Sequence, residues 1–264
     1  MTMVPLSRAD LHIHSNHSDG TASVAAILAR AAAAGLQTIA ITDHDTISGA
    51  LAARRLAREF GVEVVVGEEV STAEGHLLAL FIERELPAGR PAAETIAAAH
   101  AQGGLCVAAH PYDRSTPSLG AHGMLARCAA GEWQLDAIEG LNAGVLWHQR
   151  GSNLAARHAA HALGLPIVAG SDAHSLATLG QAYTLFPGAG AGDLYRAIVA
   201  GQVGWGGGCW TLGHYLDVCQ QWIVQRGPLG LLRLALDGAG ITRRQPAAPE
   251  GFAAARPIEK EIAL

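Results

Sequence analysis

Residues 9–20 read ADLHIHSNHSDG, an apolar run that ends in two histidines one residue apart. Because alternate residues of a β-strand point to the same side, His12 and His14 are predicted to face the same way. Two imidazole rings on one face can bind a single cation, and histidine is the commonest metal ligand in proteins. A histidine pair alone is a weak signal, so its meaning depends on the rest of the chain.

Four more apolar runs end in histidine or carboxylate side chains. They lead into TDHD (42–45), GEEVST (67–72), AHP (109–111) and GSDAH (170–174), and His76 opens a further apolar run. A structural role would scatter such residues over helix faces and loops. Their concentration at strand ends predicts a metal centre, and nitrogen and oxygen ligands without a thiolate are typical of two or three divalent ions such as Zn²⁺, Mn²⁺ or Fe²⁺. The nine candidate ligands are His12, His14, Asp19, His44, Glu69, His76, His110, Asp172 and His174.

Short β-like runs alternate with alanine-rich helical stretches along most of the chain. This alternation predicts an α/β fold with a mostly parallel sheet. About seven strands favour a closed or nearly closed barrel over a doubly wound open sheet, and such barrels carry their chemistry at the carboxyl ends of the strands. The predicted strands are Ala9–Ile13, Thr38–Thr42, Val62–Val66, His76–Ile82, Leu105–Ala109, Ala137–Leu141 and Ile167–Gly170. The predicted helices are Ser23–Ala34, Ile47–Phe60, Ala92–Gln102, Gly123–Ala130, Ser152–Leu163 and Gly192–Ala200.

The character of the sequence changes after Gly201, where a stretch rich in glycine and tryptophan leads into two amphipathic segments. The segments Leu212–Gln225 and Leu229–Leu236 flank Pro228 and are predicted to be helices. They are expected to form a cap over one end of the barrel, with a dimer contact or a substrate lid as the alternatives. The expected domains are a barrel over residues 1–204, a C-terminal helical cap over residues 205–242 and a partly disordered tail over residues 243–264.

The composition excludes several classes of protein. Half of the 264 residues are hydrophobic and only 16% are charged, which argues against intrinsic disorder. The net charge of −5 gives no basic surface for stable binding to duplex nucleic acid. Four widely spaced cysteines indicate reduced thiols, and there is neither an apolar signal core near the start nor a run of about 18 apolar residues. We therefore expect a cytoplasmic protein without a membrane partner; its oligomeric state is left open.

Taken together, these motifs resemble those of the PHP (polymerase and histidinol phosphatase) family of metal-dependent phosphoesterases. In chain order they are DLHIHSNHSDG, ITDHD, the Glu69–His76 pair, AHP and GSDAH. The resemblance runs from about Ala9 to Gly206 and implies a distorted (β/α)7 barrel with a trinuclear metal site. It implies that Glu69 bridges the first and second metals. The other implied ligands are His12, His14 and Asp172 for the first metal, His76 and His110 for the second, and Asp19, His44 and His174 for the third.

The resemblance implies hydrolysis of a small phosphate ester, such as a phosphorylated nucleotide or an oligonucleotide end. Two neighbouring metals can hold a hydroxide that attacks phosphorus in line, while a third neutralises phosphate charge. Glu69, Asp19 and His174 are the candidate catalytic residues, and whether either of the last two protonates the leaving group is left open. The candidate substrate-binding residues are Arg114, Asn142, His148, Arg150 and His17. Three further carboxylates are expected to orient the ligand imidazoles, namely Asp10, Asp43 and Asp45.

Three other functions remain as alternatives. A histidinol-phosphate-type phosphatase is one alternative, although it shares only the metal motifs. Nucleotide specificity is weakened by a different observation. Only residues 77–109 separate His76 from His110, too few for the subdomain that nucleotide-specific relatives carry there. A regulatory PHP module that binds metal without turnover is disfavoured by the full set of ligands. A related barrel with C–N hydrolase chemistry would use a bridging lysine, and Glu69 stands in that role instead.

Overall fold

The computed structural model describes residues 5–149 and 151–238, and this part of the chain forms a single nine-stranded sheet. The sheet curls until its two halves meet, where Ile13, just beyond the first strand, pairs with Ala173, just beyond the seventh. The result is a nearly closed barrel, which confirms the predicted α/β barrel class. The strands are β1 (Leu6–Asp10), β2 (Thr38–Ile41), β3 (Glu63–Thr72), β4 (Gly75–Leu80), β5 (Leu105–Ala108), β6 (Ala137–Asn142), β7 (Ile167–Gly170), β8 (Ala182–Pro187) and β9 (Gly204–Gly207).

The sheet is mixed, whereas the sequence predicted a mostly parallel one. Its order is β7-β6-β5-β4-β3-β2-β1-β8-β9, and β4 is antiparallel to both of its neighbours, as β8 is to both of its own. The strand predicted at Val62–Val66 continues to Thr72, and Gly75 then opens β4. Two intervening residues cannot hold a crossover helix, so β3 and β4 form an antiparallel hairpin. Gly75 has φ +139°, a conformation that side-chain-bearing residues rarely adopt.

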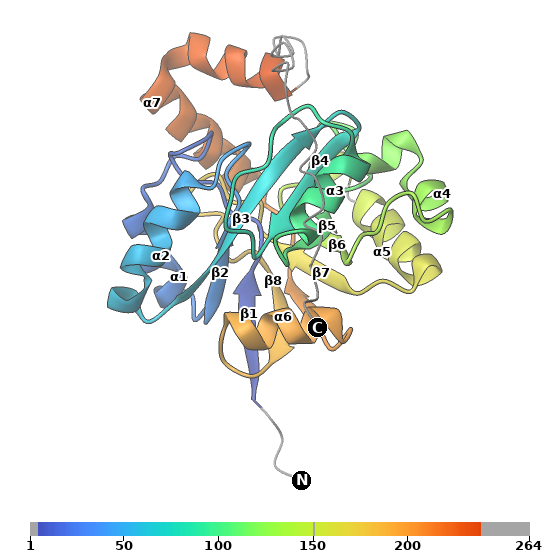
Figure 1. Ribbon diagram of the computed structural model, residues 1–264. Helices are drawn as coiled ribbons and strands as arrows, with labels where there is room; N and C mark the ends of the chain where they lie inside the picture. The colour runs from blue at the N-terminus through green and yellow to red at the C-terminus, as the bar shows by residue number, and fades with distance from the viewer. Residues whose placement is uncertain (1–4, 150, 239–264) are drawn as a thin grey trace, which may run out of the picture.

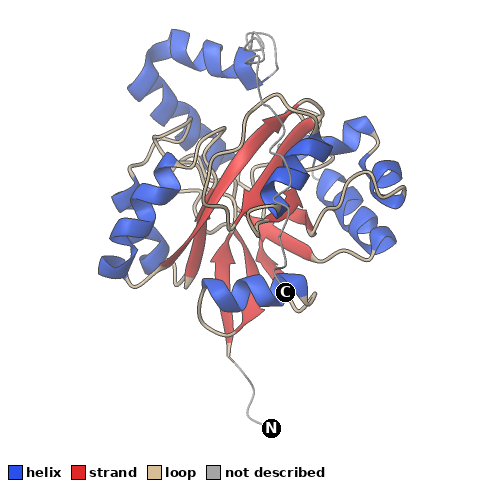
Figure 2. Cartoon of the chain, in the orientation of Figure 1, coloured by secondary structure: helices blue, strands red, loops and turns tan. Residues whose placement is uncertain are grey.

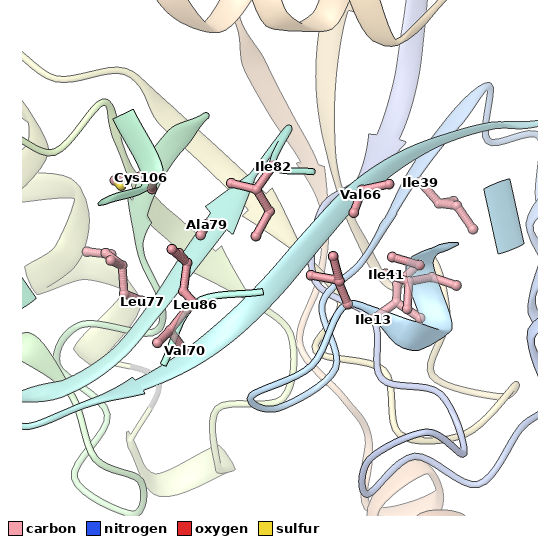
Figure 3. Packing of buried hydrophobic residues seen from close by; sticks show 14 of the residues in the cluster. Ile13, Ile39, Ile41, Val66, Val70, Leu77, Ala79, Ile82, Leu86 and Cys106 are labelled. Carbon is pink, nitrogen blue, oxygen red and sulfur yellow. The ribbon is translucent and has the colours of Figure 1, made fainter. Parts of the chain in front are cut away.

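Helices cover the outside of the barrel and one of its ends (Figures 1 and 2). Isoleucine, leucine and alanine side chains of the outer helices pack on the strands, and Figure 3 shows strand residues of this cluster such as Ile39, Ile41 and Leu77. A second cluster joins Leu194 and Ile198 of α6 to the strands. The helices are α1 (Val24–Ala33), α2 (Ser48–Phe60), α3 (Ala92–His100), α4 (Met124–Ala129), α5 (Gly151–Leu163), α6 (Ala191–Val199) and α7 (Leu212–Gly238), with short 3₁₀ helices at Leu119–His122 and Trp147–Gln149.

The C-terminal region begins inside the sheet. Strand β9 pairs with β8, so the sheet extends beyond the barrel boundary expected at residue 204. Helix α7 is broken at Gly227, which precedes Pro228 and has φ 71° and ψ 170°. A residue before proline disfavours the helical conformation, and the break lies where the sequence predicted a boundary between two helices. Its first half lies beyond the carboxyl ends of the strands, opposite α6 (Figure 1). The tail predicted at residues 243–264 lies outside the described residues.

Trp210 and Val218 attach this region to the barrel. They are 6% and 3% exposed and form a third apolar cluster with strand residues including Leu141, Ala169 and Ala182. Among the helices that the structure describes, none has the length and apolar character needed to cross a membrane.

Candidate metal centre

The nine predicted ligands converge at the carboxyl end of the barrel. Glu69 lies in β3 and His76 at the start of the antiparallel strand β4, and the other seven lie in the loops after β1, β2, β5 and β7. The polar residues that follow these parallel strands lie at the same rim of the sheet. Their ligand atoms form four overlapping groups, each spanning at most 4.8 Å. The groups are His12–His14–Glu69, His12–His110–Asp172, His44–Glu69–His76 and His14–Asp19–His44–His174.

Glu69 lies at the centre of the cluster. Its Oε2 atom is 3.2 Å from Nε2 of His12, 3.3 Å from Nε2 of His14 and 3.3 Å from Nδ1 of His44. Its Oε1 atom is 3.0 Å from Nδ1 of His76 and 2.9 Å from Nε2 of His110. The two oxygens therefore face two different sets of imidazoles, which is the arrangement that a carboxylate shared between two cations requires.

The donor atoms fit divalent cations. Five buried ring nitrogens in the described part of the chain have no hydrogen-bond partner, although carboxylate oxygens lie close by. A buried polar atom without a partner costs about 1–3 kcal/mol, so such a concentration points to a missing ligand. Imidazole nitrogens and carboxylate oxygens together suit Zn²⁺, Mn²⁺ or Fe²⁺. The five nitrogens are Nε2 of His12, both ring nitrogens of His14, Nδ1 of His44 and Nδ1 of His76.

The cluster holds its carboxylates in the charged form. Burial raises the pKa of Glu69, but the surrounding histidines, His44 and His76 foremost, bring that pKa well below its usual range. The same balance lowers the pKa of Asp19 and of Asp172. Burial lowers the pKa of His44 to about 4, whereas at His14 burial is outweighed by Asp19 and the other nearby carboxylates, which raise the pKa of His14 to about 10. Both rings must be neutral to bind a metal.

A carboxylate that sequence analysis missed orients His12. Oε1 of Glu139 lies 3.1 Å from Nδ1 of His12, which leaves Nε2 directed toward Glu69. The other oxygen of Glu139 accepts from the backbone N–H of His110 at 2.8 Å. Outer carboxylates of this kind fix the orientation and tautomer of ligand histidines. The available signal was a single acidic residue within the otherwise uncharged strand β6.

The three carboxylates expected in this orienting role accept hydrogen bonds from backbone N–H groups and, at Asp43, from serine hydroxyls. Asp10 accepts from the N–H groups of Ser171 and Gly180 at 2.8 and 2.9 Å, which ties β1 to the loop after β7. Asp43 accepts from the hydroxyl of Ser15 at 2.6 Å. Oδ1 of Asp45 accepts from a backbone N–H in β3 at 2.7 Å.

Asn142, which was expected to bind substrate, makes its side-chain contacts with other residues of the chain. Its side chain is fully buried, and its Nδ2 donates to Glu139 at 3.0 Å and to Asp172 at 3.1 Å. Its Oδ1 accepts from the N–H groups of residues 144 and 145. With its amide engaged on both sides, Asn142 positions two carboxylates, and its contact with substrate stays a prediction.

Two of the predicted ligands have a left-handed backbone. His110 has φ 27° and Asp172 has φ 54°, a region that non-glycine residues enter at a cost of about 1–3 kcal/mol. Close packing accompanies this strain, since a Cβ atom at Gly170 would lie 2.5 Å from Cβ of His12. The strand end therefore requires glycine there to bring β7 against the first histidine.

The cluster is most open to solvent on one side. His12, His14 and Glu69 have at most 1% of their side chains exposed, whereas Asp19 and His174 have 21% and 13% exposed. Oδ2 of Asp19 and Nε2 of His174 lie 3.1 Å apart on this side. His44 and Asp172 are also partly exposed, at 18% and 17%, so a ligand from solvent would meet these four residues before the buried ones.

The remaining substrate-binding candidates have different surroundings. Exposed Arg114 and His148 line one hollow of about 430 Å³, together with Tyr112 and the first turn of α5. His17 is exposed, and its Nδ1 lies 2.9 Å from Oγ of Ser48. Arg150 lies outside the described residues.

The sequence matches known family models over much of its length. The PHP domain model matches residues 10–118, and the model of the PHP-associated region matches residues 150–203. An uncharacterized protein of Methanocaldococcus jannaschii is 40% identical over 124 residues, which cover 43% of this chain and 72% of that protein. The chain therefore belongs to the PHP family.

The chain is also similar to a named enzyme in sequence and to a solved structure in fold. A phosphoribosyl 1,2-cyclic phosphate 1,2-diphosphodiesterase of Eggerthella lenta is 42% identical over 85 residues, which cover 30% of this chain and 32% of that enzyme. The match thus spans about a third of the enzyme. The fold is similar to that of a two-domain protein from Bacteroides vulgatus described as containing a predicted PHP-like metal-dependent phosphoesterase. That comparison has a TM-score of 0.66 at 19% identity and covers 78% of this chain and 66% of the other.

Proposed function

We propose that this protein is a metal-dependent phosphoesterase that hydrolyses small phosphate esters at a di- or trinuclear centre. The observation that carries the proposal is the position of Glu69, whose two oxygens face separate groups of histidines within a cluster of nine ligands. Phosphoryl transfer is the chemistry for which such paired sites are widely used. The diphosphodiesterase named among the relatives supports this choice.

When bound, two or three divalent ions would supply a water of lowered pKa and positive charge to bind the phosphoryl oxygens. The chain's own residues prepare that site. Glu139 fixes the ring of His12, and Asn142 fixes the carboxylate of Asp172. His174 receives its orientation from the backbone oxygen of Asp172, 2.8 Å from its Nδ1. Its Nε2 then lies 3.1 Å from Oδ2 of Asp19, and we propose that these two groups either hold a cation or pass a proton to the leaving group.

The metal content gives a direct test of the centre. Protein purified without chelators is expected to contain two to three transition-metal ions per chain, because nine clustered ligands exceed what one four- to six-coordinate ion can use. Elemental analysis by mass spectrometry measures this ratio. A ratio of one or less, even after reconstitution with Mn²⁺ or Zn²⁺, would contradict a multinuclear centre.

The activity is tested by screening metal-loaded protein against a panel of phosphate esters. The panel should pair monoesters with matched diesters, and should include nucleotides that carry a second phosphate and short oligonucleotides with 5′ phosphates. Release of phosphate from at least one monoester, or of an alcohol from a diester, supports the proposal. No turnover on any member with Zn²⁺, Mn²⁺ or Fe²⁺ would favour a metal-binding module without hydrolase activity.

Arg114→Ala is expected to raise KM about ten-fold for the best ester and to change kcat less. We propose that its exposed guanidinium, in the hollow shared with His148, binds phosphate equally in the ground state and the transition state. A hydrogen bond to a charged group is worth about 1.5–3 kcal/mol, which agrees with a change of that size. Steady-state kinetics separate the two constants. The control is Arg84→Ala, which changes another exposed arginine. Equal KM and kcat values for the two variants would show that Arg114 does not bind the substrate phosphate.

A further inference from the structure

One face of α7 binds the loop that carries Asp19. Nε1 of Trp222 donates to the backbone oxygen of Asp19 at 2.7 Å. Nε2 of Gln225 donates to the oxygen of residue 21 at 2.7 Å, and Nη2 of Arg226 donates to that of residue 18 at 2.8 Å. Residues three and four apart lie on the same face of a helix. Three neighbouring side chains of α7 therefore hold three carbonyl groups of a single loop.

The same helix also binds the loop that carries His174. Oδ2 of Asp217 accepts from the hydroxyl of Ser175 at 2.6 Å. The Trp222 indole meets the His174 ring nearly edge to face, with ring centres 5.5 Å apart and an angle of 83° between the planes. Helix α7 thus joins the two loops whose side chains, Asp19 and His174, approach each other to 3.1 Å.

These contacts act where the cluster is least constrained. His12 and His14 follow β1 directly and are fully buried, while Asp19 lies several residues further along a loop and is partly exposed. The family models end at residue 203, so α7 lies beyond both matched segments. The two loops also contact each other directly, since the N–H and the hydroxyl of Thr21 donate to the backbone oxygen of His174 at 2.9 and 2.8 Å. Helix α7 adds a second tether to both loops from outside the barrel.

We propose that α7 is a clamp that sets the affinity of the cation held by His14, Asp19, His44 and His174, with Trp222 as the main positioning residue. The inference rests on the proposed metal centre and concerns only this one group of ligands. Residues that orient metal ligands from outside typically change metal affinity by about 10–100-fold when they are replaced. The hydrogen bonds by which α7 holds the two loops reach none of the other three ligand groups, which should keep their affinity.

The experiment measures zinc binding by the full-length chain. Protein freed of metal with a chelator is equilibrated with zinc buffered at a series of free concentrations, and bound zinc per chain is determined by mass spectrometry. Trp222→Phe keeps an aromatic ring beside His174 and removes the N–H that binds Asp19. We expect the last zinc ion to bind this variant at a free zinc concentration about ten-fold higher than in the wild type. The zinc ions that bind earlier should keep their affinities.

Two further variants make the result specific. Val224→Ser changes a residue of the same helix that is 74% exposed, and its curve should match that of the wild type. Asp217→Ala breaks the contact with the second loop and should shift the last equivalent in the same direction as Trp222→Phe. It also tests the proposal independently if the tryptophan variant folds poorly.

The outcomes separate this inference from the proposed function, because zinc binding is read without any substrate. If Trp222→Phe and Asp217→Ala both bind zinc like Val224→Ser, the clamp is wrong even if the protein is an active phosphoesterase. Loss of all equivalents together with a lower Tm also overturns it, since that result means general destabilisation. A selective shift in a protein that hydrolyses no ester supports the clamp and leaves only the proposed reaction in error.

Discussion

Glu69→Gln is expected to lower kcat by at least about 10²-fold, the effect of removing a main electrostatic group from an active site. Both oxygens of Glu69 lie within 3.3 Å of ring nitrogens, on two sides of the cluster. Glutamine keeps the shape but loses the charge, and its amide group would turn N–H donors toward the cations. The measurement is kcat on the best ester of the panel, with metal content determined on the same sample.

Glu68→Gln is the matched control for this prediction. Glu68 is also fully buried, and its Oε2 accepts from the N–H of Leu86 at 2.9 Å, away from the cluster. Burial raises the pKa of Glu68 to about 8, so the group is mostly protonated at neutral pH and glutamine resembles it. Its activity should stay close to that of the wild type. Near-normal turnover of Glu69→Gln at full metal occupancy, or a larger loss in His174→Ala, would contradict the bridging role.

A chain that ends at Gly208 is expected to melt at a Tm lower by about 10 °C or more. It keeps β9 but loses Trp210 and Val218, which are almost fully buried, and the half-buried rings of Tyr215 and Trp222. Each large apolar side chain contributes about 1.5–3 kcal/mol through burial, and 1 kcal/mol shifts Tm by about 2–4 °C in a chain of this size. Thermal unfolding followed by circular dichroism gives the comparison.

The control is a chain that ends at Thr242, for which we expect an unchanged Tm and unchanged activity. This pair of truncations distinguishes a helical cap from a contact between copies of the chain. If the chain ending at Gly208 is active, has the Tm of the full chain and has become monomeric, then α7 serves association and the cap interpretation is wrong.

The rim of the barrel could be predicted because it follows from local pattern. A polar residue at the end of an apolar strand must lie at the sheet edge, so the ligand motifs were visible one strand at a time. The hairpin was less visible, since Glu68 and Glu69 interrupt the apolar run of β3 although the strand continues through them. Strand β9, with the sequence GWGG, has a low intrinsic preference for β-structure and forms by pairing with β8.

What the sequence could not show are contacts between distant parts of the chain. Glu139 and His12 are separated by 127 residues, and Trp222 and Asp19 by 203. Neither pair carries a spacing signal, because only the closed barrel brings them together. The same limit applies to Asn142, a polar residue at a strand end whose contacts with Glu139 and Asp172 no local pattern shows.

The left-handed backbone at His110 and Asp172 has a consequence for engineering this protein. A redesign that optimised stability alone would place glycine or asparagine at both positions, where the backbone would relax. Each such change would also delete a predicted metal ligand. Stability and function therefore favour different residues at these two positions, as is common at active sites. Thermostable variants should be sought at positions remote from these strand ends, such as the exposed Val199 of α6.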